Sequence, residues 1–127
     1  MKIKMIKVLD LRDLYEKIKT QSLPITTTYK ISKLFTAINS EIEFYQTQLN
    51  SIIQEYGKKD ENGQFLMTED KQGVQVEQDK IAEAQSKIVE LHNLEVDLPD
   101  IKFNLPELEK IELSVEEFNN LLPFIED

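Results

Sequence analysis

The chain has 127 residues, no cysteine and a formal net charge of −9, with 40% hydrophobic and 31% charged residues. This length suits one domain with a modest core, and three glycines and four prolines are too few for a sandwich or barrel rich in tight turns. The composition also excludes disulfides and thiolate chemistry, offers no apolar run near the roughly 20 residues of a membrane span, and disfavours free nucleic acid as a partner.

The first residues are β-prone and rich in lysine. We expect a strand of about five residues within residues 2–8, followed by a helix that Asp10 caps. The predicted apolar face of this helix repeats at three and four residues: Leu11, Leu14 and Ile18. Leu23-Pro24 ends the helix, because the residue before a proline is pushed out of the α region.

A long helix dominates the prediction. Apolar or aromatic residues recur at alternating steps of four and three, which is one seam of an α-helix. The seam consists of Ile31, Phe35, Ile38, Ile42, Tyr45, Leu49, Ile52 and Tyr56. We expect five of these side chains to be buried: Phe35, Ile38, Ile42, Leu49 and Ile52. Residues 26–28, all threonine, offer three possible N-caps, and Gly57 is the natural stop.

Residues 57–73 interrupt the helical pattern with a polar segment. Asn62-Gly63 is the strongest short hairpin signal in the chain. Residues 64–68 and 74–76 are candidate short strands, with a second turn between them. We therefore predict a tip over residues 58–76 that protrudes from two helices, either as a β-hairpin or as an irregular loop.

A second helix of the hairpin is predicted from Asp79. Its apolar face again repeats at three and four residues: Ile81, Ala84, Ile88 and Leu91. Because it is connected through the tip, this helix must run back along the C-terminal half of the long helix. The first helix can cover the N-terminal half, so the seam can be buried within one chain and dimerisation is optional.

The last part of the chain, residues 94–127, changes period. Alternating apolar residues punctuated by Pro99 and Pro106 predict edge or extended segments. Ser114 and Glu117 form a capping box for a short terminal helix. Residues 1–33 carry a net charge of +5 and residues 94–127 a net charge of −8. Either the two ends lie near each other, or the acidic tail faces a basic partner.

Together these elements predict a mainly α fold, with α+β as a possibility. Its parts are a long antiparallel helical hairpin, an additional N-terminal helix, the protruding polar or β-hairpin tip, and a small extended or β element that joins the N-terminal strand and the C-terminal tail. We expect a single domain over residues 1–127, with a helical body of about residues 10–93 and the acidic tail 94–127.

Several short stretches are scattered over most of the chain: Met1-Lys2-Ile3-Lys4, Leu23-Pro24 before Tyr29-Lys30-Ile31, residues 55–63, Leu94-Glu95-Val96 with Leu98-Pro99, Ile111-Glu112-Leu113-Ser114, and Leu122-Pro123-Phe124-Ile125. Together these stretches resemble a group of small bacteriophage or prophage proteins of unknown function. The resemblance implies a phage or prophage origin, and it carries no catalytic or binding residues to this chain.

The sequence contains no catalytic constellation and no cofactor motif. His92 is the only histidine, and a lone histidine at a helix end is more often a partner of the helix dipole than a ligand. Residues 60–63 resemble a calcium loop only loosely, because position 12 counted from Asp60 is Lys71 and not a glutamate. We therefore expect no enzyme activity, no cofactor and no metal site.

The expected function is protein binding. The chain is predicted to be a phage-encoded, non-enzymatic protein that acts on a host factor in the bacterial cytoplasm, as a monomer or low-order homo-oligomer. The alternative is a virion structural or assembly component, such as a connector, tail or scaffold subunit. We expect a protein partner, and neither nucleic acid nor a membrane.

The candidate partner-binding residues are apolar side chains of the tip and the tail. They are Phe65, Met67, Phe103, Phe118, Leu122 and Phe124. Apolar surface with an acidic rim is the composition expected of a protein-binding surface with charge steering. The other interpretation is that the tail merely completes the core.

Overall fold

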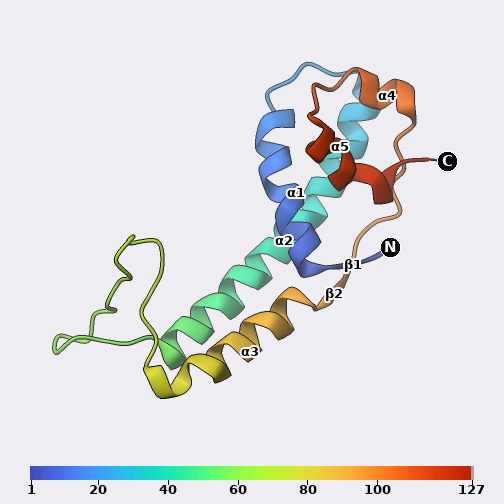
Figure 1. Cartoon of the computed structure of the whole chain (residues 1–127). Helices are drawn as coiled ribbons and strands as arrows, with labels where there is room; N and C mark the ends of the chain where they lie inside the picture. The colour runs from blue at the N-terminus through green and yellow to red at the C-terminus, as the bar shows by residue number, and fades with distance from the viewer. Residues whose placement is uncertain (127) are drawn as a thin grey trace. The chain divides into compact units, whose positions relative to one another are not determined.

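The computed structural model describes residues 1–126 and is mainly helical, as predicted (Figure 1). In chain order its elements are β1 (Lys2–Lys4), α1 (Met5–Ile18), α2 (Ile25–Tyr56), the 3₁₀ helix η1 (Gln78–Lys80), α3 (Ile81–His92), β2 (Glu95–Asp97), α4 (Leu105–Glu109), α5 (Val115–Leu121) and the 3₁₀ helix η2 (Leu122–Phe124). Within residues 1–126, no helix combines the length and the apolar character needed to cross a membrane.

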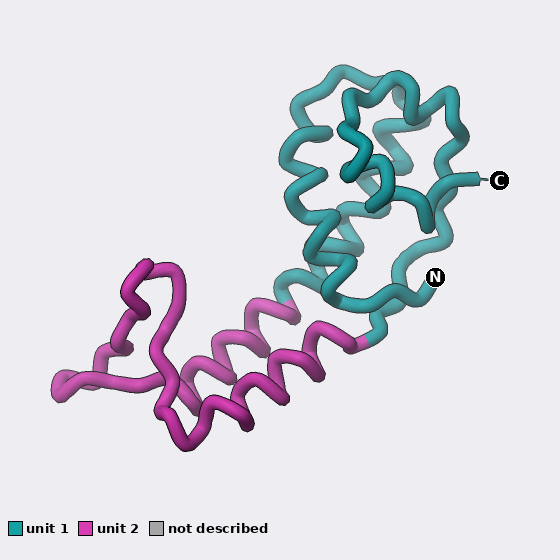
Figure 2. The backbone as a smooth tube through the Cα atoms, viewed as in Figure 1, with its two compact units in different colours: residues 1–43, 95–127 teal, residues 44–94 magenta. Residues whose placement is uncertain are grey.

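The chain divides into two compact units (Figure 2). Unit 1 comprises Met1–Glu43 and Glu95–Asp127, and unit 2 comprises Phe44–Leu94. This division differs from the predicted one between a helical body and a tail, because residues 95–127 group with the N-terminal residues. Helix α2 contributes residues 25–43 to unit 1 and residues 44–56 to unit 2.

In unit 1, the first strand is shorter than predicted and the first helix starts earlier. Helix α1 begins at Met5, so Asp10 lies inside it and the predicted cap is wrong. Met5 and Val8 extend the buried face that also contains the predicted Leu11, Leu14 and Ile18. The apolar spacing of three residues from Met5 onward suits a helix that can bury one face, and this outweighs the weak β propensity of the segment.

Helix α2 also starts before its predicted caps. Its first residue is Ile25, and the carbonyl of Pro24 accepts the Thr28 N–H at 2.9 Å, so residues 26–28 lie in the first turn. The predicted stop is confirmed, because α2 ends at Tyr56. A side chain at Gly57 would place its Cβ 2.5 Å from the Ile53 carbonyl and 2.8 Å from the Phe65 ring, so the close approach there requires glycine.

The predicted seam is only partly buried. In unit 1, Phe35 and Ile38 are buried as expected, and the ring of Tyr15 from α1 stacks on Phe35 with 4.7 Å between ring centroids. Three predicted core positions are half-buried: Ile42 in unit 1, and Leu49 and Ile52 in unit 2. In unit 2 a single helix, α3, packs along α2, and one neighbour covers only part of a wide apolar stripe.

The predicted β element is confirmed as a two-stranded antiparallel sheet. β1 pairs with β2, with Ile3 opposite Val96, and the N-terminal ammonium of Met1 donates to the Leu98 carbonyl at 2.8 Å. Leu105, predicted as extended, instead starts α4. The sequence reason is a second capping box, in which Asn104 and Glu107 satisfy each other's backbone N–H groups.

Unit 2 contains the predicted antiparallel helical hairpin. Helix α3 runs back along residues 44–56, and two contacts fix the direction: the Tyr45 hydroxyl lies 3.1 Å from His92 Nε2, and Lys87 Nζ lies 3.4 Å from Glu55 Oε2. Asp79 lies in η1 and not at the start of α3. Ala84 and Leu91 are buried, Ile88 is half-buried and Ile81 is exposed.

The tip of unit 2 combines the two predicted alternatives. Extended segments pair at three isolated positions: Gly57 with Val76, Lys59 with Phe65, and Met67 with Val74. Three backbone hydrogen bonds close a cycle among them: Lys58 N–H donates to Gln75, Gln75 N–H to Leu66, and Leu66 N–H to Lys58, at 2.7, 2.8 and 2.8 Å. The tip is thus three mutually bonded segments and not a single hairpin.

Candidate functional site

Unit 1 contains a largely apolar groove of about 390 Å³ on the C-terminal segment. We call it the tail groove. It is lined by Leu105, Leu108, Glu109, Ile111, Leu113, Val115 and Phe118. These residues come from α4, the connecting loop and the start of α5, so one continuous stretch of chain builds the whole surface.

Two capping boxes shape the tail groove. In α4, the Asn104 side chain accepts the Glu107 N–H, and in α5 the Ser114 side chain accepts the Glu117 N–H, as the sequence predicts for α5. Each box ends one extended segment and fixes the first residue of a short helix. Those first residues are Leu105 and Val115, which are 54% and 79% exposed. The caps therefore hold two apolar side chains in solvent.

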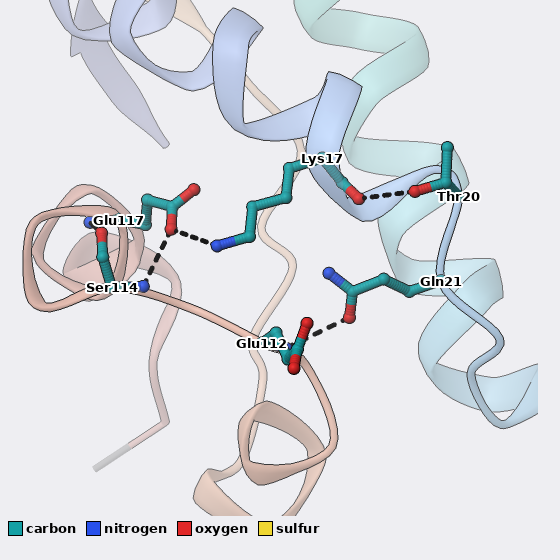
Figure 3. Close-up of polar contacts among 6 residues, drawn as sticks. All are labelled: Lys17, Thr20, Gln21, Glu112, Ser114 and Glu117. Carbon is teal, nitrogen blue, oxygen red and sulfur yellow. Dashed lines mark hydrogen bonds and ion pairs between the residues drawn. The ribbon is translucent and has the colours of Figure 1, made fainter.

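Helix α1 holds α5, and the segment that follows α1 holds the loop between α4 and α5 (Figure 3). Lys17 Nζ lies 2.7 Å from Glu117 Oε1, and the Gln21 side chain accepts the Glu112 N–H at 3.1 Å. The Lys17 ammonium, with the Ser114 N–H, lowers the pKa of Glu117. The carboxylate that completes the α5 cap is therefore ionised at neutral pH and tied to the first helix.

Helix α4 is attached to α2 through Glu107. Burial alone would raise the pKa of Glu107, but the Lys30 ammonium at 2.7 Å, the Asn104 N–H and the Thr27 hydroxyl together lower it. These contacts and the N-terminal ion pair with Asp97 confirm that the basic and acidic ends lie together. The two ends neutralise part of each other's charge within unit 1.

The tail groove has one charged side chain in its lining. Glu109 is exposed and forms no ion pair within residues 1–126. Glu112 and Glu116 are also exposed and without an ion pair there, and they adjoin lining residues in the sequence. The carboxylate of Glu109 would favour a cationic group of a ligand at the groove.

The predicted partner-binding residues fall in different places. Phe118 lines the tail groove, and Leu122 is exposed on η2 without lining it. Phe103 and Phe124 are 2% and 0% exposed, so both are core residues and cannot contact a partner in the folded chain. Removal of their apolar surface from water favours this burial, and the Phe103 N–H, which donates to the Phe124 carbonyl at 2.7 Å, pairs the two segments.

The other two predicted residues, Phe65 and Met67, belong to the tip of unit 2. Phe65 is half-buried against Gly57, with Lys59 Nζ 5.1 Å from its ring centroid, and Met67 is exposed.

The sequence analysis did not include three apolar residues that line the tail groove: Leu105, Leu113 and Val115. The capping box was a usable signal for Val115, because it places that residue at the first helical position, away from the helix's buried face.

The chemistry of the tail groove suits binding. Its side chains are aliphatic and aromatic, with the single carboxylate of Glu109 among them. Within residues 1–126, no group of three or more histidine, aspartate and glutamate side chains is placed to hold a metal ion.

In comparisons with protein-family models, curated proteins and solved structures, no match to this chain was found.

Proposed function

We propose that this chain is a non-enzymatic protein-binding protein, and that the tail groove receives a basic, amphipathic segment of its partner. One observation carries the proposal: an apolar groove of about 390 Å³ has a single carboxylate in its lining, that of Glu109, which has no ion-pair partner within the described residues. Apolar side chains of a partner would fill the groove, while a lysine or arginine side chain would meet Glu109.

The apolar contribution to such binding rests on Leu105 and Val115. Complete burial of an aliphatic side chain gives about 1.5–3 kcal/mol relative to its exposed state, so covering both would supply a useful part of a binding free energy. The groove would need little reorganisation on binding, because Glu107 and Glu117 already fix the helices on either side of it.

We further propose that the partner is a bacterial host factor and that the chain is of phage or prophage origin, working in the host cytoplasm. The resemblance of the scattered stretches to small phage proteins supports the origin. The alternative is a virion structural or assembly component. A groove on unit 2, described below, favours this alternative, because subunits of an assembly need surfaces that bind copies of themselves.

A random-peptide library, panned against the immobilised chain, tests the proposed ligand. We expect enriched peptides to combine lysine or arginine with leucine, isoleucine or phenylalanine, and to bind more weakly as salt rises. Val115→Ser should weaken them roughly tenfold, because one buried aliphatic side chain is lost. Ile25→Ser is the matched control: Ile25 is also the first residue of a helix in unit 1, is 88% exposed, and does not line the groove.

Two results would contradict the proposed ligand. One is the enrichment of acidic or uncharged peptides, or of none. The other is equal binding by the Val115→Ser and wild-type chains. Mass spectrometry of purified phage particles separates the two functional classes: presence of the chain as a stoichiometric component favours the assembly role, and its absence from particles favours the host-directed role.

A further inference from the structure

Unit 2 buries few side chains for its size. Of residues 44–94, all of them described, only Tyr56, Ala84 and Leu91 are buried. The seam residues Leu49 and Ile52 stay half-buried. A pair of helices can bury only the stripes that face each other, so a wide apolar stripe on two helices needs a further layer. The hairpin of unit 2 therefore keeps apolar surface that another element could cover.

That surface forms a groove of about 340 Å³ along the hairpin, which we call the hairpin groove. From α2 it is lined by Phe44, Gln48, Ser51, Ile52 and Glu55, from α3 by Lys87, Glu90 and Leu91, and just beyond α3 by Leu94. Phe44 and Leu94 are 45% and 40% exposed. The groove thus combines exposed apolar side chains with polar and charged ones, as a helix–helix interface does.

The charges on the α3 side of the hairpin groove are self-complementary. Lys87 and Glu90 both line the groove and lie one helical turn apart. In two antiparallel copies of α3 related by a two-fold axis between these positions, Lys87 of each copy lies opposite Glu90 of the other. Lys87 is 46% exposed despite its ion pair with Glu55, so it retains donors for a second carboxylate.

We propose that the chain self-associates through unit 2, with the hairpin grooves of two copies packed against each other in an antiparallel four-helix arrangement. Two symmetric Lys87–Glu90 pairs lie at the two-fold axis and set its register, and Phe44, Ile52 and Leu94 of both copies supply its apolar contacts. Self-association is independent of the tail groove, which belongs to unit 1. The interface is small, and we expect a dissociation constant in the micromolar range.

Sedimentation velocity over a concentration series tests the proposal with two charge variants. Lys87→Glu and Glu90→Lys should each weaken self-association roughly tenfold, since both symmetric contacts change from attraction to repulsion. An equimolar mixture of the two variants should restore it, because every contact across the axis then joins a lysine to a glutamate. The mixture leaves the contacts within each chain unchanged, so altered folding cannot explain the rescue.

A second pair of variants tests the apolar contacts of the interface. Phe44→Ser should weaken self-association, whereas Val89→Ser should not, because Val89 is exposed on α3 and does not line the hairpin groove. Equal helix content by circular dichroism confirms that both variants fold. A wild-type chain that stays monomeric at all concentrations overturns the proposal and leaves the groove to a different partner. Failure of the mixture to restore association overturns the antiparallel register.

Discussion

Lys17 and Glu117 lie 100 residues apart in the sequence and form an ion pair of 2.7 Å. Glu117 is also the residue that closes the α5 capping box by accepting the Ser114 N–H at 2.8 Å. One carboxylate therefore joins a local helix signal to the first helix of the chain. The same pair positions the loop and helix that build the tail groove.

The Lys17–Glu117 pair should make stability depend on pH in a defined direction. Because Lys17 and the Ser114 N–H lower the pKa of Glu117 below its ordinary value of 4.5, the stability is present above that value and is lost as pH falls through the lowered pKa. Glu117→Gln should lower the thermal midpoint at pH 7, and its difference from wild type should shrink toward pH 3. Glu112→Gln is the control, since that exposed carboxylate has no ion pair within residues 1–126. A difference that is constant with pH would contradict this role.

The C-terminal residues should be essential to the core of unit 1. Phe124 is completely buried, and truncation of a buried phenylalanine typically costs about 3–5 kcal/mol. We expect Phe124→Ala to lose that amount in urea unfolding. Leu122→Ala, a neighbouring change at a residue 52% exposed, should cost much less. A loss from Phe124→Ala as small as the loss from Leu122→Ala would contradict a core role for Phe124.

Two positions on the α2 seam should differ sharply when replaced by aspartate. Ile38 is 0% exposed, so Ile38→Asp buries an unpaired carboxylate and should cost at least about 4 kcal/mol. Ile42 is half-buried, and the same change there leaves the carboxylate access to water, so we expect about 1–2 kcal/mol. Thermal unfolding of the two variants side by side measures the contrast. Equal losses would mean that burial is uniform along the seam.

Replacement of Gly57, the residue that follows α2, should destabilise the tip. Gly57→Ala forces a Cβ against the Ile53 carbonyl and the Phe65 ring, which should cost about 1–3 kcal/mol. Hydrogen exchange should quicken at the amides of Lys58, Leu66 and Gln75, which close the tip's hydrogen-bond cycle. Gly73→Ala is the control, because its nearest contacts lie 4.0 Å away on Thr68. Unchanged exchange in Gly57→Ala would contradict the strained contact.

Much of the fold follows from local sequence signals. The four-three spacing from Ile31 to Tyr56 predicts the long helix, Gly57 its end, and Ser114 with Glu117 the start of α5, because each of these depends on residues within a turn or two of chain. The opposite charges of the two ends left two alternatives, proximity of the ends or a basic partner for the tail, and the Lys30–Glu107 and Met1–Asp97 ion pairs show the ends close together. By contrast, the start of α1 at Met5 depended on burial of its face, which local β propensity does not report.

Burial and the candidate site were decided by tertiary structure. Ile38 and Ile42 are equivalent in the sequence pattern, yet only Ile38 is fully covered, since cover depends on how many elements pack on that part of the helix. Phe103, Phe118 and Phe124 looked alike as tail aromatics. In the folded chain the segments of Phe103 and Phe124 pair through a backbone hydrogen bond and both rings are in the core, whereas Phe118 lines the tail groove. Sequence periodicity encodes the geometry of single elements, whereas exposure is a property of the neighbours that folding brings together.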